Sequence, residues 1–269
     1  MPTVAFALIG HNEAHCLPRA LESIRWADEI VYVDCGSRDN SLEVARRYTQ
    51  KVYSRPNNTN LNVNKQYAID QTTADWIFYL DPDEVVTPQL ARDIQEAVRG
   101  NGPANAYHLP RRNFFCGHWL RFGGKYPDTQ LRLFRRGKAR FPCVHVHEKL
   151  AVDGPEGRLR SPMDHYASAS VATTLRKMDF YSSFNAQQMA RAGKKPGFLL
   201  AVTFLLWKPG IRFIRRYIFK GGILDGWPGL VIAGIDAMEL VFQLFKFWDY
   251  ATHPERLPPQ GVHVEGGAQ

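Results

Sequence analysis

Short apolar runs alternate with helix-type segments over the first third of the chain. The runs at residues 3–9, 29–34, 51–53 and 76–80 have strand character, and segments with helical spacing of apolar residues separate them. Strands that alternate with helices predict right-handed crossovers. We therefore predict an α/β fold with a mostly parallel sheet and helices on both faces.

Polar side chains follow these strands at the positions where each strand ends. Asn12 and Glu13 follow the first run, Asp34 ends the second, and Asp81 and Asp83 follow the fourth. In sheets of this kind, ligands bind at the carboxyl ends of the strands. The sequence therefore predicts a ligand site at this edge.

The turn Asp81-Pro82-Asp83-Glu84 gathers three carboxylates into four positions. Like charges so close repel one another unless a cation or a proton offsets them. An Asp-X-Asp step directs two carboxylates the same way from an extended chain, and such ligands suit Mg²⁺ or Mn²⁺. The alternative is an acidic turn in which Asp83 or Glu84 caps a helix that begins near Thr87.

Composition narrows the class of partner. The 269 residues allow one large α/β domain with an appendage, and the four cysteines lack metal-ligand spacing, which indicates reduced cytosolic thiols. The N-terminus enters directly into a strand, so we expect no signal peptide. The formal net charge of +8 predicts an anionic partner. No usual nucleic-acid-binding motif occurs, so we expect no nucleic acid, and the C-terminal segment described below favours an anionic lipid surface.

Three motifs at residues 9–13, 31–39 and 80–84 resemble, in content, order and spacing, the nucleotide-binding half of the family 2 inverting glycosyltransferases. Residues 132–136 and 146–148 resemble more narrowly the branch that glucosylates the lipopolysaccharide inner core. The resemblance implies a GT-A fold and metal-dependent transfer of a hexose, glucose from UDP-glucose, to a lipopolysaccharide core or related glycolipid. It also implies a cytoplasmic protein, peripheral to the inner face of the cell membrane.

The resemblance implies roles for individual residues. Asp34 would accept a hydrogen bond from the uracil ring, Asp81 would hold the ribose or a metal-bound water, and Asp83 would hold the metal. For Asp39 the alternative is capping of the next helix, and for Lys65 it is a solvated helix face. The further residues expected to bind the nucleotide sugar are Asn12, Glu13, Asp39 and Lys65.

The catalytic base of an inverting transferase is a carboxylate that takes the proton of the acceptor hydroxyl. Residues 123–132 resemble the family region that carries a glycine pair and then the base, so Asp128 is the first candidate. Glu148, in the group His145-Val146-His147-Glu148, is the second. His147, beside Glu148, could complete the metal shell. His145 and His147 on one strand face are also compatible with zinc, although no further ligand stands at a supporting spacing.

Arg111 and Arg132 belong to a basic concentration on the expected acceptor side of the site. Arginine forks suit phosphate groups, which inner-core sugars carry in number. We therefore expect both residues to bind the acceptor. The alternative is that many arginines here are solvated or paired with acids.

The chain changes character after about residue 167. A helical segment at residues 171–192 precedes the apolar run 198–207 and the cationic, aromatic run 208–220. The apolar run is too short to span a bilayer, and the combination resembles an interfacial helix on anionic lipid. An ordinary helical subdomain or a dimer interface is the alternative. The predicted divisions are a GT-A catalytic domain at 1–165, a helical region at 166–252 and a disordered tail at 253–269.

Other functions stay open. A polyprenyl phosphate or another envelope polysaccharide is the main rival acceptor. A nucleotidyltransferase also uses paired aspartates and Mg²⁺, but residues 10–13 are not its Gly-rich phosphate loop. An inactive sugar-nucleotide-binding module is the third possibility, and the retention of Asp34, Asp81 and Asp83 argues against it.

Overall fold

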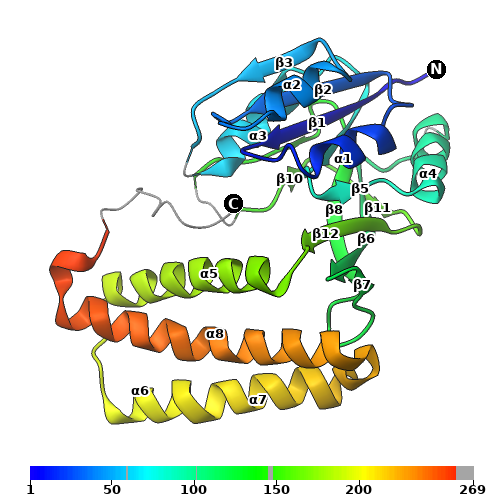
Figure 1. The fold of residues 1–269 in the computed structure, drawn as a ribbon. Coiled ribbons are helices and arrows are strands. Elements are labelled where there is room, and N and C mark those ends of the chain that lie inside the picture. The colour runs from blue at the N-terminus through cyan, green and yellow to red at the C-terminus, as the bar shows by residue number, and fades with distance from the viewer. Residues whose placement is uncertain (59, 101, 145–147, 259–269) are drawn as a thin grey trace. The chain divides into compact units, whose positions relative to one another are not determined.

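The computed structural model divides into two compact units, each of which is described by itself. The first comprises Met1–Arg112 and Pro127–His165, and the second comprises Asn113–Tyr126 and Tyr166–Gln269. Figure 1 shows that strands dominate the first unit and long helices the second. The structure describes four stretches of the chain, which are residues 1–58, 60–100, 102–144 and 148–258.

Most strands of the described chain join one mixed sheet. Its order is β3 (Lys51–Ser54), β2 (Glu29–Asp34), β1 (Val4–Gly10), β4 (Trp76–Leu80), β8 (Asp128–Arg135), β6 (Ala106–Phe115), β12 (Met163–Ser168) and β5 (Glu84–Val85). Strands β1 to β4 pair in parallel, whereas β8 runs antiparallel to β4 and β6. The expected parallel sheet is thus confirmed for its first four strands, and antiparallel strands extend it. The remaining strands are β7 (His118–Trp119) and β11 (Glu156–Arg158) on β6, and the separate pair β9 (Ala139–Arg140) and β10 (Ala151–Val152).

Helices cover both faces of the parallel half. Phe6 and Leu8 of β1 pack into one cluster with side chains of α1 (Leu17–Ser23), α2 (Ser41–Arg46) and α4 (Pro88–Arg99). Ala7 and Ile9 point to the other face, where α3 (Leu61–Asp70) contributes Ala68 and Ile69 to a second cluster. Successive side chains of a strand alternate between faces, so a strand buried on both faces is apolar throughout. This is why β1 is buried at all seven positions.

The start of α4 corrects one expectation. The N-cap is Thr87, whose Oγ1 accepts a hydrogen bond from Leu90 N at 3.2 Å. Neither Asp83 nor Glu84 caps this helix, because Glu84 belongs to β5 and its side chain is fully buried. The acidic turn therefore has a different role from capping.

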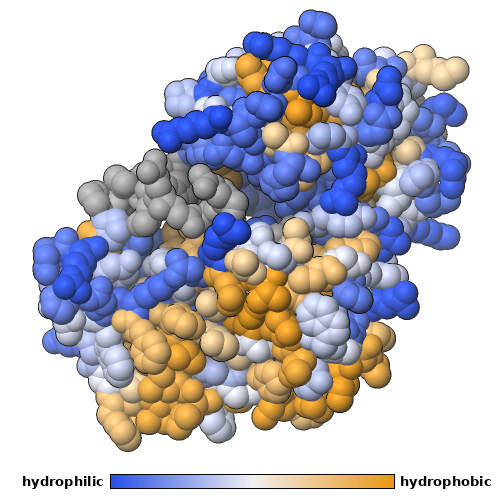
Figure 2. All heavy atoms as spheres, viewed as in Figure 1, coloured by the Kyte–Doolittle hydropathy of each residue, from blue (hydrophilic) through white to orange (hydrophobic). Residues whose placement is uncertain are grey.

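The second unit is built around its longest helix, α8 (Gly226–Thr252), which packs against α5 (Val171–Arg191) and α7 (Lys208–Ile214). A π-helical turn at Thr203–Trp207 joins α6 (Phe198–Val202) to α7, and a second at Arg215–Phe219 extends α7. No helix of the described chain has both the length and the apolar character needed to cross a membrane. Figure 2 shows apolar side chains exposed over α6, α7 and α8. Two short 3-10 helices complete the unit, at Gly222–Asp225 and Pro254–Arg256.

The segment Asn113–Tyr126 belongs to the second unit and is fastened to its helices. Asp225 accepts hydrogen bonds from the backbone of Arg121 and Phe122 at 3.1 and 2.9 Å, and Gly123 N donates to Lys220 O at 2.9 Å. Gly123 has a φ of 65°, which favours glycine. The glycine pair expected ahead of Asp128 is therefore held by the helical unit.

Candidate active site

Three neighbouring strands carry the predicted nucleotide residues to one edge of the sheet. β1 pairs Gly10 with Asp34 of β2 and Leu8 with Leu80 of β4, so Asp34 and Asp81 lie on either side of the end of β1. Two strand spacings separate such positions by about 10 Å. A nucleoside with its first phosphates spans a distance of this order, so the edge is dimensioned for a nucleotide.

Asp34 is a buried acidic group of this edge, with 5% of its surface exposed. Its Oδ2 accepts a hydrogen bond from Ser37 N at 3.1 Å. Its Oδ1 is buried and has no hydrogen-bond partner among the described residues. An unsatisfied buried acceptor costs about 1–3 kcal/mol, so this oxygen suits an N–H donor of a ligand.

Asn12 joins the loops that follow β1 and β2. It adopts a left-handed backbone with a φ of 58°, a conformation that asparagine tolerates better than most residues. Its backbone N donates to Ser37 Oγ at 2.9 Å, and its Oδ1 accepts from Arg38 N at 2.8 Å. These contacts shape the rim beside Asp34, and a direct contact of Asn12 with the nucleotide stays a prediction.

Glu13 and Asp39 fasten the same loops to α2. Glu13 N donates to Ser41 Oγ at 2.8 Å, while Asp39 accepts from Ala14 N and Ser41 N, each at 3.0 Å. Burial raises the pKa of Asp39, but the hydrogen bond from the Ser41 hydroxyl and those from the Ala14 and Ser41 backbone lower it by more, so its net pKa lies below the usual range. Asp39 therefore supports the start of α2, and its nucleotide-binding role stays a prediction.

Asp81 lies between two cationic side chains. Lys65 Nζ, from α3, lies 3.2 Å from its Oδ1, and Arg132 Nη2, from β8, lies 2.9 Å from its Oδ2. Tyr79 Oη also donates to Oδ2 at 3.0 Å. Burial raises the pKa of Asp81, but Lys65 and Arg132 lower it more, so the carboxyl stays ionised. Lys65 thus faces the site and does not lie on a solvated helix face.

Glu84 connects Asp81 to the first candidate base. Its Oε1 accepts from Arg132 Nη2 at 2.5 Å and from Arg111 Nη1 at 2.9 Å. Arg111 in turn donates from Nε and Nη2 to Asp128 Oδ2 at 2.9 and 2.7 Å. An unbroken series of ion pairs therefore runs from Asp81 through Arg132, Glu84 and Arg111 to Asp128.

Arg111 and Arg132 are both committed to carboxylates here. Burial lowers the pKa of each guanidinium, and the neighbouring carboxylates, Glu84 foremost, raise it more, so both stay charged. Arg132 has only 3% of its side chain exposed, and Arg111 has 18%. Both arginines therefore form ion pairs with acidic side chains, which was the alternative to acceptor binding. Acceptor binding by either arginine stays a prediction.

Asp83, the predicted metal ligand, lies beside a histidine that the sequence did not single out. Its Oδ2 lies 3.4 Å from His165 Nε2 of β12, and both side chains are partly exposed. Antiparallel pairing of β12 with β5 sets His165 opposite Glu84 and so produces this contact. One carboxylate and one imidazole fit a divalent cation that takes its other ligands from phosphate and water.

The second group of predicted residues follows Cys143. Glu148 accepts hydrogen bonds from Val144 N on both carboxylate oxygens, at 2.9 and 3.0 Å. His145 and His147 lie outside the described residues, so a metal role for His147 stays a prediction. Of the two candidate bases, Asp128 is the one that the ion-pair series joins to Asp81.

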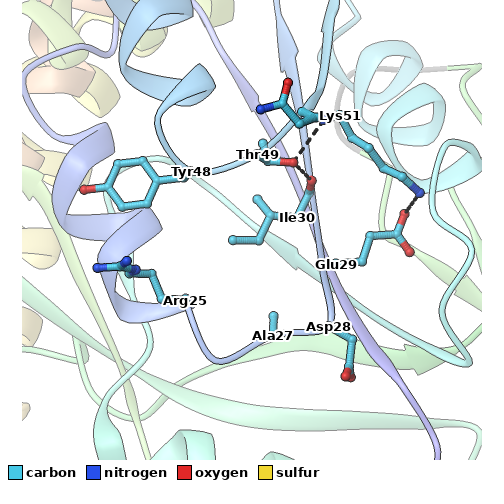
Figure 3. A pocket seen from close by; sticks show the side chains of 9 residues that line it. Arg25, Ala27, Asp28, Glu29, Ile30, Tyr48, Thr49 and Lys51 are labelled. Atoms are coloured by element: carbon cyan, nitrogen blue, oxygen red, sulfur yellow. Dashed lines mark hydrogen bonds and ion pairs between the residues drawn. The ribbon is translucent and has the colours of Figure 1, made fainter.

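A surface pocket of about 370 Å³ lies at the opposite end of the strands, where β2 and β3 begin (Figure 3). Its polar groups largely satisfy one another. Lys51 Nζ contacts Glu29 Oε1 at 2.8 Å, and Thr49 Oγ1 donates to Ile30 O at 2.6 Å. None of the predicted site residues lines this pocket, so it is separate from the candidate active site.

The mixed sheet, its acidic edge and the Asp81–Asp83 turn are features of a GT-A glycosyltransferase. The chain belongs to glycosyl transferase family 2, whose model matches residues 7–149. The protein is therefore an enzyme that transfers a sugar, as its sequence motifs predicted.

Relatives match over most of the chain. A lipopolysaccharide core biosynthesis glycosyltransferase, LpsC of Rhizobium meliloti (strain 1021), is 27% identical over 254 residues, which cover 89% of this chain and 92% of the relative. An uncharacterised glycosyltransferase of Rickettsia typhi is 25% identical over 245 residues, which cover 86% of this chain and 83% of that relative. The mannosyltransferase PcManGT of Pyrobaculum calidifontis, solved with GDP-Man and Mn²⁺, is similar in fold with a TM-score of 0.50 at 12% identity, covering 95% of this chain and 88% of that one.

Proposed function

We propose that this enzyme is a metal-dependent inverting hexosyltransferase that moves glucose from UDP-glucose to a lipopolysaccharide core sugar or a related envelope glycolipid. The observation that carries the proposal is the acidic edge of the sheet. There, a buried carboxylate with an unsatisfied oxygen, Asp34, is followed two strands away by Asp81 and Asp83. Asp34 suits a nucleobase, Asp81 suits a ribose, and Asp83 suits the metal ion that binds the diphosphate.

The uracil specificity of the proposal rests on Asp34. The N3–H of uracil is a donor that an unsatisfied carboxylate oxygen can accept, whereas the N3 of cytosine offers none. The burial of Asp34 strengthens such a bond, because a hydrogen bond is stronger in a low dielectric than in water. Lys65, charged and next to Asp81, lies where it can meet the phosphates once Asp81 has bound the ribose.

Asp83 and His165 would hold the metal in this proposal, and a bound Mg²⁺ or Mn²⁺ would offset the charge that develops on the departing diphosphate. Asp128 would take the proton of the acceptor hydroxyl as that oxygen attacks the anomeric carbon. In a single displacement, the bond to the diphosphate breaks on the opposite face of the sugar, which inverts the anomeric configuration. The two hydrogen bonds from Arg111 fix the direction in which the Asp128 carboxylate points.

The acceptor is inferred from the relative named for lipopolysaccharide core biosynthesis, which matches nearly the whole chain. An acceptor of this kind is held in a lipid membrane, so the enzyme would work as a peripheral protein at the cytoplasmic face. The net charge of +8 favours such an anionic surface.

A thermal-shift panel of nucleotide sugars, each with and without Mn²⁺, tests the donor. The true donor stabilises the folded enzyme by mass action, so UDP-glucose with Mn²⁺ should raise the melting temperature more than GDP or ADP sugars. The Asp34→Ala variant is the matched control and should lose the uridine-specific shift.

Transfer to deacylated core oligosaccharide and to a polyprenyl phosphate, followed by NMR of the new anomeric bond, separates the acceptors and tests inversion. A larger shift with a non-uridine sugar, or retention of configuration, would contradict the proposal.

A further inference from the structure

The helical unit exposes an apolar face that its own core does not use. Over residues 198–219, one side of the helix packs inward through Phe204 and Pro209, which are buried. The opposite side carries large apolar residues, with Leu206 70% and Trp207 67% exposed. We call this side the α6–α7 face, and its exposed members include Leu199, Val202, Leu206, Trp207, Ile211 and Ile214.

An apolar face of this extent has a partner in most soluble proteins. Large exposed apolar patches mark sites of contact with proteins or membranes. Figure 2 shows hydrophobic residues gathered over α6 and α7. The helix is continuous through its π-helical turns, so the face forms one surface along the segment.

Charge on the same segment identifies the partner. Residues 198–220 contain five cationic residues and no acidic one. Arg212 and Arg216 turn inward, where they contact Asp236 of α8. Arg215 and Lys220 are exposed beside the apolar residues. An apolar face with exposed cations at its edge complements an anionic lipid surface.

We propose that the α6–α7 face lies in the headgroup region of an anionic bilayer, with the helix axis parallel to the membrane plane. A second copy of the chain fits less well. Residues 198–220 of a second copy would offer Arg215 and Lys220 no complementary charge, because this segment contains no acidic residue. The proposal gives the proposed function its membrane contact, but binding to lipid can be measured without a glycosyl donor or acceptor.

Flotation with lipid vesicles tests the face directly. The full chain is mixed with vesicles of phosphatidylcholine alone or with added phosphatidylglycerol. The wild type should float with the anionic vesicles, and Leu206→Glu/Ile214→Glu should reduce the bound fraction by roughly tenfold or more, because two apolar side chains no longer enter the lipid. The matched control is Ala172→Glu/Gln188→Glu, which adds the same charge at exposed positions of α5 and should float like the wild type.

The charge contribution has its own variant. Arg215→Gln/Lys220→Gln should weaken binding to anionic vesicles by roughly fivefold per residue, and added salt should weaken wild-type binding in the same way. Trp207 supplies a direct reading of depth, because brominated lipids should quench its fluorescence. Trp207→Phe should lose that quenching and still float.

Hydrolysis of the nucleotide sugar in the absence of vesicles distinguishes a failure of the membrane-binding proposal from a failure of the proposed glycosyltransferase function. Leu206→Glu/Ile214→Glu should retain hydrolysis while it loses flotation, whereas failure of the donor assignment would leave flotation intact. Equal flotation of this variant and the wild type would overturn the proposal. So would a wild-type dimer in analytical ultracentrifugation that ignores vesicles and dissociates in Leu206→Glu/Ile214→Glu, since the face would then join two copies.

Discussion

Arg111 donates two hydrogen bonds, at 2.9 and 2.7 Å, to one and the same carboxylate oxygen of Asp128. Gln130 Nε2 donates to the other oxygen at 2.8 Å. Asp128 is thus held on both oxygens by side chains of β6 and β8, the strands at the centre of the antiparallel half of the sheet. A general base needs a fixed direction toward the proton that it removes, and this arrangement provides one.

Asp128→Asn should therefore lower kcat by about 10²- to 10⁴-fold, the usual contribution of a positioned base. Its affinity for UDP, measured by calorimetry, should stay within about twofold of the wild type, because the proposed nucleotide residues do not include it. Glu148→Gln is the comparison variant and should retain most of its turnover. If Glu148→Gln instead loses kcat while Asp128→Asn keeps it, the base is Glu148.

Glu84→Gln should impair both stability and turnover. The substitution removes the buried carboxylate charge that pairs with Arg111 and Arg132. Loss of one partner of a buried ion pair costs about 3–5 kcal/mol. Urea denaturation measures this loss, and kcat should fall because Arg111 no longer holds Asp128. The control is Thr87→Ala, which removes the cap of α4 at about 1 kcal/mol and should leave kcat unchanged. In the Asp128→Asn background, Glu84→Gln should have little further effect on kcat, and an additive loss would refute the connection.

The sequence was sufficient to predict the parallel half of the sheet and its acidic edge. β1 and β4 are buried on both faces and therefore stand out as apolar runs, and a parallel arrangement brings their carboxyl ends together. It was not sufficient for the role of Glu84. The partners of Glu84 lie 27 and 48 residues along the chain, on strands whose antiparallel pairing leaves no periodic signal near the acidic turn. Local charge density thus suggested a cap where the fold makes a buried ion pair.

The same limit applies to His165. Its contact with Asp83 arises from the pairing of β12 with β5. β5 has only two residues, and no apolar run in the sequence predicts it as a strand. A histidine on β12 carries no local signal of metal binding. The sequence therefore predicted Asp83 as a metal ligand from the Asp-X-Asp step and His147 from its place beside Glu148, and only the sheet topology shows the imidazole of His165 next to Asp83.

Asp83→Ala should abolish the stabilisation that Mn²⁺ gives in the presence of UDP. His165→Ala should weaken it less, because a carboxylate is the stronger ligand for a hard cation. Calorimetric titration with Mn²⁺ measures both, independently of turnover. Glu22→Ala, at an exposed position of α1, is the control and should bind Mn²⁺ like the wild type. Unchanged Mn²⁺ affinity in Asp83→Ala would exclude the assigned metal site.

Asp34→Ala should weaken the binding of UDP by about 10- to 100-fold, which corresponds to one hydrogen bond to a charged group. Asp39→Ala should weaken it less, since the Asp39 carboxylate is engaged with the backbone of Ala14 and Ser41. Calorimetry with UDP and with CDP distinguishes the roles, because only loss of a uracil-specific contact narrows the difference between the two nucleotides. An equal loss of UDP and CDP affinity in Asp34→Ala would assign that residue to loop structure instead.

The ion pairs of Asp81 should make the stability of the enzyme depend on pH in a defined window. The pKa of Asp81 is held well below that of an unfolded aspartate, about 3.9. A depressed pKa gives stability that is fully present above the unfolded value and is lost as the pH falls toward the folded one. The difference in unfolding free energy between the wild type and Asp81→Asn should therefore be constant from pH 7 to about 5 and shrink below about 4. Urea denaturation across this range measures it, with the exposed Asp70→Asn as control, and a difference that shrinks near pH 6 would mean that Lys65 and Arg132 do not hold Asp81 ionised.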